Sequence, residues 1–359
     1  MKIISLFSGC GGLDLGFTNA GFKLAYANDF DKAITETFEK NHGIELDTRS
    51  INDIKSEELP TADGIIGGPP CQSWSLAGAM KGIKDKRGRL FYEYIRVIRD
   101  KKPKFFLAEN VPGIISSTHL PEFKRIIGML EALGYNVSYH LVDARDYGVP
   151  QERKRVIVIG YRKDLHIKFS MPLPTHSKTN KINVIKTPLR KWVTLKEAIG
   201  NLPAPLPAKE KNKSNANLLI PNNEYFIGSY STIYMSRNRV RGWDEQSFTI
   251  QASGRHAPLH PSSSKMKKVA KNRMQFVGEK PTYRRLSVRE AARIQTFPDD
   301  FIFYYGNLND GYKMIGNAVP VKLAEAIALK IETDLSSLIT ADRILKKQQL
   351  HNNRKVQNL

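Results

Sequence analysis

Residues 2–160 alternate short apolar runs with stretches of helical periodicity, and this alternation restricts the possible folds more than any other feature. The apolar runs are KIISLF, KLAYAN, ADGIIGG, KFFLAEN, NVSYHLVDA and RVIVIGYR. The helical patterns between them are LDLGFTNAGF, DKAITETFEKNH, RLFYEYIRVIRDKKP and EFKRIIGMLEALG. The alternation predicts an α/β fold, in which a mostly parallel sheet carries helices on both faces. Such sheets bind ligands at the carboxyl ends of their strands, so the residues after each run are candidates for a site.

The pattern changes after about residue 165. Residues 171–223 are rich in proline, lysine and asparagine, and residues 224–262 hold short β-like runs with Arg, Tyr, Ser and Gly. Helical patterns return in RRLSVREAARIQTF, which predicts a clear amphipathic helix, and in VPVKLAEAIALKIETDL. We therefore predict a first domain of residues 1–170 and 305–335, a second, smaller and irregular domain with a hinge at residues 171–304, and a basic tail at residues 336–359.

The charge balance indicates a polyanionic partner. The formal net charge is +21, and so large an excess of one sign indicates nucleic acid more often than solubility alone. No apolar run approaches the roughly 20 residues that a spanning helix needs, so we expect no membrane contact. The two cysteines cannot form a disulfide framework, and no Cys/His cluster has zinc spacing. These features predict a reducing, cytoplasmic compartment and no metal site.

A glycine-rich turn, Ser8-Gly9-Cys10-Gly11-Gly12, follows the first predicted strand and opens the first helix. Glycines at this place let the backbone approach a ligand, although a tight turn alone explains them as well. The next strand ends at Asp29, where sheets of this kind hold a ribose, whereas capping of the following helix accounts only for Asp31. Phe30 is a candidate for stacking on adenine, with core packing as the alternative. A second nucleotide-binding half is missing, which favours a mononucleoside cofactor over NAD.

The segment GGPPCQSWS places Cys71 behind two prolines at the exit of a predicted strand. A free cysteine is most often a small buried hydrophobe, but a rigid strand exit is where active-site loops lie. Glu109, at the end of FFLAEN, falls on the same sheet edge and is a candidate proton donor. Gln151, Arg153 and Arg155 alternate, so they face one side of an extended segment. That face either holds a planar, oxygen-bearing ring or is a solvated strand face.

Six blocks in this order resemble the DNA (cytosine-5)-methyltransferase family: FSGCGGLDLGF, GGPPCQ, ENV, QERKR, RRLSVREAARIQTFP and GNAVP. The resemblance implies a Rossmann-like methyltransferase sheet and S-adenosylmethionine as the methyl donor, with no metal. It implies that Cys71 adds to C6 of a cytosine flipped out of the duplex, because covalent addition activates C5. The loop from about residue 72 to residue 89 would then close over the DNA. The resemblance assigns no residue to the removal of the C5 proton.

The resemblance also assigns site residues. Besides Cys71, the catalytic set is Glu109 at N3 of the base, Arg155 at O2, Arg153 and Gln151 as support, and Asn110 of the ENV block. The cofactor set is Phe7, Gly9, Gly11, Gly12, Leu13, Asp29, Phe30, Asp53, Ile54, Pro70, Asn317, Ala318 and Val319. The sequence departs from the family's usual pattern twice: Asp29 stands where Glu is common, and GNA stands where GNS is common.

The segment between QERKR and RRLSVRE is where the family places target recognition. Here EYFIGSYSTIYMSRNRVRGWDEQSFTIQASGRHAPLHP resembles members whose site is GGCC, which implies guanine reading by Arg237, Arg239 and Arg255. Arginine forks pair bidentately with guanine O6 and N7. Arg241 and the run SSSKMKKVAKNR are interpreted as phosphate contacts or as having no role. We expect a monomeric bacterial type II methyltransferase that acts on double-stranded DNA, with a cognate restriction endonuclease as its functional partner.

Three other functions remain as alternatives. A tRNA cytosine-5 methyltransferase shares the catalytic blocks, but a small recognition region is expected there. A catalytically inactive DNA-binding regulator has no reason to keep PCQ, ENV and QERKR together. An NAD-dependent oxidoreductase rests on the glycine turn alone.

Overall fold

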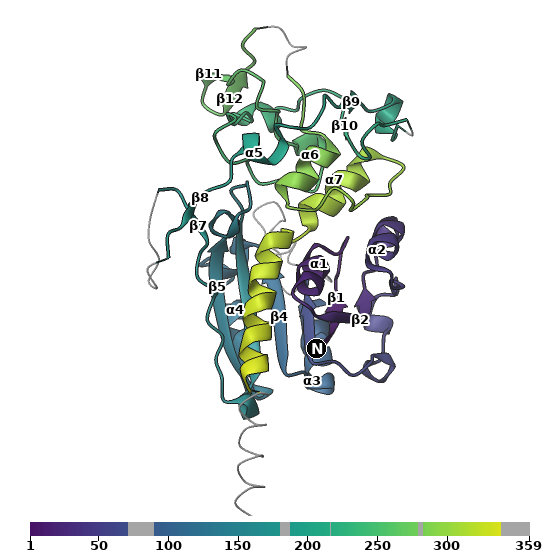
Figure 1. Ribbon diagram of the computed structural model, residues 1–359, viewed down its shortest axis with the longest axis vertical. Helices are drawn as coiled ribbons and strands as arrows, with labels where there is room; N and C mark the ends of the chain where they lie inside the picture. The colour runs from purple at the N-terminus through teal and green to yellow at the C-terminus, as the bar shows by residue number, and fades with distance from the viewer. Residues whose placement is uncertain (71–89, 180–186, 216, 279–282, 339–359) are drawn as a thin grey trace, which may run out of the picture.

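The computed structural model describes residues 1–70, 90–179, 187–215, 217–278 and 283–338. Its central sheet has the strand order β2-β1-β3-β4-β6-β5 (Figure 1). The strands are β1 (Lys2–Leu6), β2 (Lys23–Asn28), β3 (Gly64–Gly67), β4 (Phe105–Asn110), β5 (Tyr135–Asp143) and β6 (Lys154–Arg162). Neighbouring strands from β2 to β4 pair in parallel, and only β6 is reversed, antiparallel to both β4 and β5. The predicted α/β fold is confirmed. The reversal follows from the direct β5–β6 connection, since parallel neighbours need a longer crossover.

Helices cover both faces of the sheet. One face packs against α1 (Gly12–Asn19), α2 (Thr35–His42) and a helix over residues 321–338. The other packs against α3 (Leu90–Lys101) and α4 (Leu120–Ala132). Successive strand residues point to opposite faces, so Phe105 joins the first core and Phe106 the second. The helix over residues 321–338 brings the chain back to the first part of the fold, where Asp334 accepts a 2.9 Å hydrogen bond from Tyr161.

Residues between β6 and that last helix form the irregular upper part of Figure 1. The described elements there are β7 (His176–Ser177), β8 (Arg190–Lys191), α5 (Leu195–Ile199), β9 (Leu206–Pro207), β10 (Glu224–Tyr225), β11 (Lys267–Ala270), β12 (Arg273–Gln275), α6 (Val288–Ile294) and α7 (Leu308–Asn317). The strands form two-stranded sheets, of which only β11–β12 is antiparallel. Much of this part shares the first core of the sheet, through residues such as Leu195, Phe226 and Leu286. A second, small core lies within it, with Tyr234, Val240, Leu259, Met266 and Tyr283 buried.

Helix α6 differs from the amphipathic helix that the sequence predicts. It is seven residues long, and its polar residues Arg289 and Glu290 are buried with the apolar ones. Arg289 donates to the carbonyls of Pro221 and Phe301, and Glu290 accepts two 2.8 Å hydrogen bonds from Arg284. Burial of these charges is possible because each has partners, which a periodicity pattern does not reveal.

Across the described ranges, the helices are too short or too polar to cross a membrane. In the same ranges, no three or more His, Cys, Asp or Glu side chains are arranged to hold a metal ion.

Candidate cofactor and catalytic site

The carboxyl ends of four parallel strands bring the predicted motifs to one edge of the sheet. In the register of the sheet, Leu6 of β1 pairs with Asn28 and with Gly67, and Gly67 pairs with Ala108. The glycine turn, the Asp29 loop, the Gly67–Pro70 exit and the end of FFLAEN therefore lie together. Asn110 connects two of them, because its side-chain amide donates a 3.1 Å hydrogen bond to the carbonyl of Pro69.

The glycine turn is held by Asp29. Gly9 and Gly11 have φ angles of 57° and 88°, a left-handed backbone that favours glycine. The Gly9 amide donates to one oxygen of Asp29 at 2.9 Å, and the Asp31 amide donates to the other at 3.0 Å. Burial raises the pKa of the Asp29 carboxyl. Asp31 itself accepts from Ala33 at the start of a short 3₁₀ helix, which confirms its capping role.

Phe30 lies beside Asp29 with 63% of its surface exposed. The core-packing alternative for this residue is therefore wrong. An exposed aromatic ring next to a carboxylate is a suitable surface for a nucleoside base.

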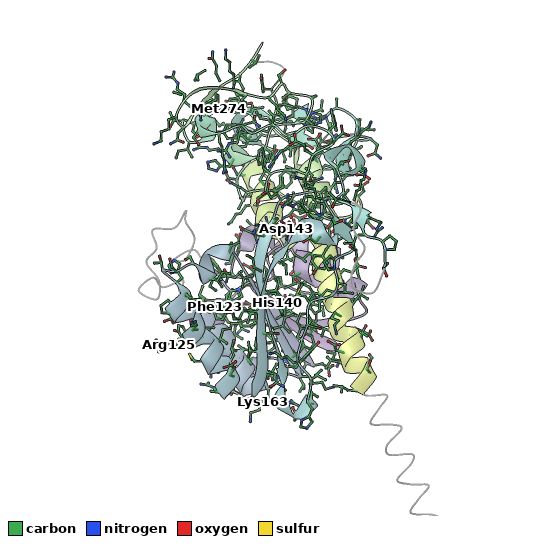
Figure 2. The ribbon with its side chains drawn as sticks, turned by 90° about the vertical axis from the view of Figure 1, so that its left-hand side faces the viewer. Phe123, Arg125, His140, Asp143, Lys163 and Met274 are labelled. Atoms are coloured by element: carbon green, nitrogen blue, oxygen red, sulfur yellow. The ribbon has the colours of Figure 1, made fainter. Side chains whose placement is uncertain are left out.

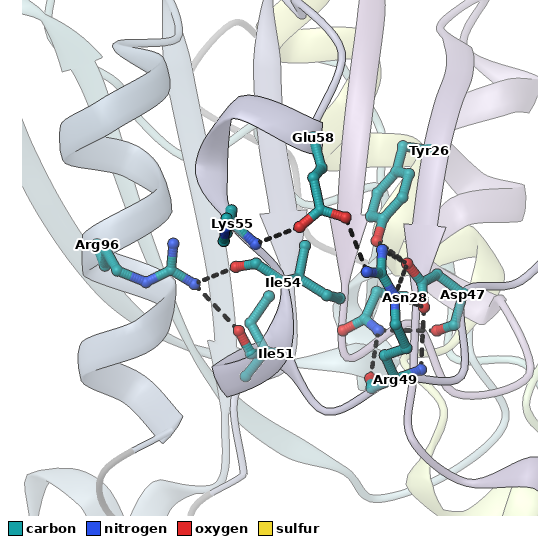
Figure 3. Close-up of polar contacts among 9 residues, drawn as sticks. All are labelled: Tyr26, Asn28, Asp47, Arg49, Ile51, Ile54, Lys55, Glu58 and Arg96. Carbon is teal, nitrogen blue, oxygen red and sulfur yellow. Dashed lines mark hydrogen bonds and ion pairs between the residues drawn. The ribbon is translucent and has the colours of Figure 1, made fainter.

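The loop that carries Asp53 and Ile54 is braced by residues that the sequence did not single out (Figure 3). Arg96 of α3 donates to the carbonyls of Ile51 and Ile54, both at 3.0 Å. Arg49 pairs with Asp47 and with Glu58 in the same region. Sequence analysis missed them because a charged residue on an amphipathic helix or in a loop normally faces solvent.

The GNAVP block packs directly on the glycine turn. A side chain at Gly12 would lie 2.5 Å from the Val319 carbonyl and 3.0 Å from the Ala318 side chain, so only glycine fits there. Asn317 ends α7, and Ala318 and Val319 are buried behind it. The structure therefore brings residues 317–319 to the predicted cofactor loop near the start of the chain.

Glu109 and Arg155 form a buried ion pair at the same edge. The Arg155 Nε lies 2.7 Å from Glu109 Oε1, and each residue is 9% exposed. Burial lowers the pKa of Arg155, and the Glu109 carboxylate partly offsets this. The other Glu109 oxygen lies 3.6 Å from the position of a side chain at Gly68. The pair thus faces the strand exit that leads to Cys71, which itself lies outside the described residues, as does the predicted closing loop.

Gln151 and Arg153 are buried behind this pair rather than beside it. Gln151 donates to Gln295 at 2.5 Å and accepts from the Ile250 amide at 3.0 Å. Arg153 donates to the carbonyls of Ile250, Gly316 and Ala318 at 2.9–3.1 Å. Their interpretation as a solvated strand face is wrong. Only Arg155 of the three lies beside Glu109, whereas Gln151 bonds to Gln295 and Arg153 bonds to the GNAVP block.

Asp14, on the first turn of α1, is a buried group that sequence analysis missed. Neither of its carboxylate oxygens has a hydrogen bond of good geometry within the described part of the chain, although the nearby Ser5 hydroxyl acts to lower its pKa. Burial raises its pKa to about 7. The pattern LDLGF gave no signal, because an acid near a helix start normally faces solvent.

The predicted recognition arginines do not share one environment. Arg237 and Arg255 are exposed. Arg239 is only 6% exposed, and it donates to the carbonyls of Tyr234 and Ile233 at 2.9 and 3.1 Å. Its guanidinium also lies 4.7 Å from the centre of the Tyr234 ring. Arg239 therefore braces the loop that carries Arg237.

Arg241 is engaged inside the protein. It forms ion pairs of 3.0 Å with Glu152 and 3.2 Å with Glu245, and its guanidinium lies 4.2 Å from the Phe248 ring. With two carboxylates beside it, Arg241 is a poor phosphate ligand, and the structure favours the second interpretation, no DNA contact.

Comparisons with known proteins identify the family. The family model for the C-5 cytosine-specific DNA methylase matches residues 1–333. The chain belongs to this family. The methylase is 58% identical over 341 residues to Type II methyltransferase M.MthTI of Methanothermobacter thermautotrophicus, an alignment that covers 94% of this chain and 99% of that protein. It is 55% identical to Type II methyltransferase M.FnuDI of Fusobacterium nucleatum, in an alignment that covers 94% of this chain and 95% of that protein.

Solved structures agree on the fold. A putative DNA modification methyltransferase encoded within an E. coli prophage matches with a TM-score of 0.69 and 25% identity, over 94% of this chain and 99% of that one. The methylase is thus an S-adenosylmethionine-type methyltransferase that acts on cytosine C5 in DNA. The NAD-dependent alternative is wrong, and the type II relatives do not favour the tRNA alternative.

The residues at the sheet edge fit the methyl donor of this family. No heavy atom of the described residues lies within 4 Å of the side-chain position at Gly9, so the turn leaves open space beside the Asp29 carboxylate. A carboxylate suits a ribose diol, and the exposed Phe30 ring suits an adenine. The carboxylate and the ring together are suited to a nucleoside.

Proposed function

We propose that this methylase methylates C5 of the inner cytosine of GGCC in double-stranded DNA, as the modification enzyme of a restriction system. The observation that carries the chemistry is the buried Glu109–Arg155 pair beside the Gly67–Pro70 exit. The target site rests on the resemblance of residues 224–261 to the recognition region of the methylase from the HaeIII system, whose site is GGCC. The exposure of Arg237 and Arg255 is consistent with base reading there.

Arg155 and Glu109 bind different atoms of the base. Arg155 uses Nε for Glu109 and Nη1 for the Lys154 carbonyl. Its Nη2 is left, within the described residues, to donate to O2 of cytosine. Glu109 hydrogen-bonds and protonates N3, which stabilises the electron-rich ring that forms when Cys71 Sγ bonds to C6. Asn110 fixes Pro69 and so positions the segment that delivers Cys71.

The remaining steps restore the base. S-adenosylmethionine, held by the glycine turn, Asp29 and Phe30, supplies the methyl group to C5 when it is bound. The C5 proton then leaves, to water or to a base that we do not assign. The Sγ–C6 bond breaks by β-elimination, the N3 proton returns to Glu109, and Cys71 is released as a thiolate. The flipped position of the base follows from the need to reach C6 and N3 together.

Bisulfite sequencing of a plasmid from an expressing host tests the target. We expect methylation confined to the inner cytosine of GGCC, and methylation centred on another sequence would refute this assignment. A tritiated-methyl assay on duplex DNA and on tRNA separates the remaining alternative, with incorporation expected only into DNA.

Cys71→Ser tests the mechanism. The hydroxyl is a far weaker nucleophile than a thiolate, so methyl transfer should be lost while binding of S-adenosylmethionine, measured by calorimetry, is kept. Turnover near that of the wild type would show that Cys71 is not the nucleophile.

We further propose that the enzyme is a monomer in the bacterial cytoplasm, with residues 1–170 and 305–335 as its catalytic domain and residues 171–304 as its recognition domain and hinge. The molecular mass in solution, measured by sedimentation, would test whether the enzyme is a monomer.

A further inference from the structure

The hairpin formed by β11 and β12 carries four cations that are not used inside the described part of the chain. Lys267, Lys268, Lys271 and Arg273 are exposed, and none of them forms an ion pair with a described residue. Residues 260–278 contain no Asp or Glu. The neighbouring Lys265, in contrast, lies 3.5 Å from Glu245. The hairpin therefore presents an uncompensated charge of one sign.

Folding alone gives little reason for this hairpin. Every residue of β11 is exposed, including Val269 at 45%. An isolated two-stranded hairpin is marginally stable by itself, and the exposed residues of β11 add nothing to the core. An exposed, positively charged hairpin is a surface for contact with a polyanion.

The base of the hairpin is nevertheless firmly fixed. Met266 is buried in the small core, and Met274 and Phe276 pack against it. The Phe276 ring lies 4.3 Å from that of Tyr283 and 4.9 Å from that of Tyr230. The hairpin is thus a projecting element on a rigid base.

The same core holds the loop of the recognition arginines. Tyr234, three residues before Arg237, is fully buried in it, and the 3₁₀ helix η9 (Tyr234–Ser236) packs against β12. Asn238, between Arg237 and Arg239, accepts a 3.2 Å hydrogen bond from the Met266 amide. Hairpin and arginine loop are therefore one unit with a fixed mutual position. In Figure 2, Met274 of β12 and Phe123 of α4 lie on the same side of the molecule, opposite the helix over residues 321–338.

We propose that the β11–β12 hairpin binds backbone phosphates of the duplex that flanks the recognised bases. This inference rests on the proposed function. When Arg237 and Arg255 reach base edges in a groove roughly 12 Å wide, an element fixed to their loop and projecting beyond it meets the adjoining backbone. Phosphate contacts set affinity and register without reading sequence. The hairpin lengthens the bound stretch of DNA and leaves the choice of site to the arginines.

The test is a variant in which Lys267, Lys268, Lys271 and Arg273 are all replaced by Gln, bound to two duplexes that contain GGCC. One duplex ends about two base pairs beyond the site, and the other extends by about one helical turn, roughly ten base pairs, on each side. Fluorescence anisotropy gives Kd for each over a range of salt concentrations. Each phosphate contact contributes about 0.9 to the slope of log affinity against log salt. We therefore expect the slope on the long duplex to become shallower by about 3.6, with affinity at least about tenfold lower near 0.1 M salt.

On the short duplex the variant should bind like the wild type, and bisulfite sequencing should find the same methylated site. A matched control replaces Lys23, Lys102, Lys163 and Lys168, exposed lysines of the first domain, by Gln. Lys163 lies at the end of the molecule farthest from the hairpin in Figure 2. This control should bind both duplexes like the wild type.

Equal weakening on the two duplexes would overturn the flanking position, and an unchanged salt slope would overturn the phosphate contact. An equal effect in the control variant would also overturn the inference, since total charge would then explain the result. If the wild type bound both duplexes without salt dependence, the proposed function would fail together with the inference. Thermal melting of each variant confirms that the fold is kept.

Discussion

Asp14 shows most clearly how a single residue can act against the stability of this fold. Its carboxylate is fully buried, and burial raises its pKa from 3.8 to about 7. Between these two values the folded state binds a proton that the unfolded state has lost, so the free energy of unfolding falls as pH rises through this range. Above pH 7 the penalty is complete and amounts to at most about 4 kcal/mol.

Asp14→Asn should therefore stabilise the enzyme at pH 8 and lose this advantage as the pH falls towards 4. Urea denaturation at several pH values measures the difference from the wild type. The exposed Asp300→Asn is the control and should show no such trend. A stability difference for Asp14→Asn that is constant with pH would show that the carboxyl stays ionised in the folded state.

Replacement of Arg237 and replacement of Arg239 are expected to have different effects, the first on DNA binding and the second on stability. Arg237→Ala should weaken binding to GGCC far more than to a scrambled duplex and leave the melting temperature unchanged, because the side chain is exposed. Arg239→Ala should instead lower the free energy of unfolding by about 1–3 kcal/mol, because it removes two hydrogen bonds to the loop carbonyls. Equal loss on both duplexes would make Arg237 a backbone contact.

At the scale of elements, the turn between β1 and α1 fits against α2. A side chain at Gly11 would lie 1.9 Å from Nε2 of His42, the last residue of α2. His42 packs on Phe38 with ring centres 4.5 Å apart, so it has little room to move. Burial lowers the pKa of His42 to about 4, which keeps the ring neutral near pH 7.

Gly11→Ala should lose about 1–3 kcal/mol more stability than Gly21→Ala. Both glycines have a left-handed backbone, with φ of 88° and 87°, but no described atom lies within 4 Å of the side-chain position at Gly21. The difference between the variants thus isolates the contact with His42, since the backbone strain of roughly 1–2 kcal/mol is shared. Chemical denaturation measures it. If both lost the same amount, His42 would be able to move aside.

The sequence predicted the elements far better than it predicted their partners. Period-two and helical patterns identified the strands and helices of the first domain, because a pattern records which residues face a core. The reversed direction of β6 and the burial of α6 escaped it, since both depend on contacts distant in sequence. Glu109 and Arg155 were predicted to act together and do lie together. Gln151 and Arg153 share the same spacing, but their partners, Gln295 and the GNAVP carbonyls, lie more than a hundred residues away.

At the scale of the whole molecule, Arg153 connects parts of the chain that are far apart in sequence. Its guanidinium donates to Ile250 in the upper part and to Gly316 and Ala318 of the GNAVP block. Burial holds its pKa well below the usual value for arginine. The Ala318 carbonyl also accepts from Gln295, but those of Ile250 and Gly316 depend on Arg153, and each costs about 1–3 kcal/mol when left unpaired.

Arg153→Met should destabilise the enzyme by at least about 2 kcal/mol, because two buried carbonyls lose their donor. Scanning calorimetry should show one transition at a lower temperature than that of the wild type, since the apolar core that joins the two parts is kept. The control is Arg162→Met, whose partly exposed ion pair with Asp164 is worth about 1 kcal/mol or less. An unchanged midpoint would show that the two carbonyls do not depend on Arg153.

The return of the chain to its starting point has a consequence for synthesis. Gly16 of α1 packs against Val321 and Ala324 of the last described helix, and the GNAVP block closes on Gly12. While the ribosome is still making the recognition region, the glycine turn therefore lacks the residues that support it. We therefore expect a chain that ends before the GNAVP block to bind no S-adenosylmethionine, because the support of Gly12 and Gly16 by residues 318–325 would be missing.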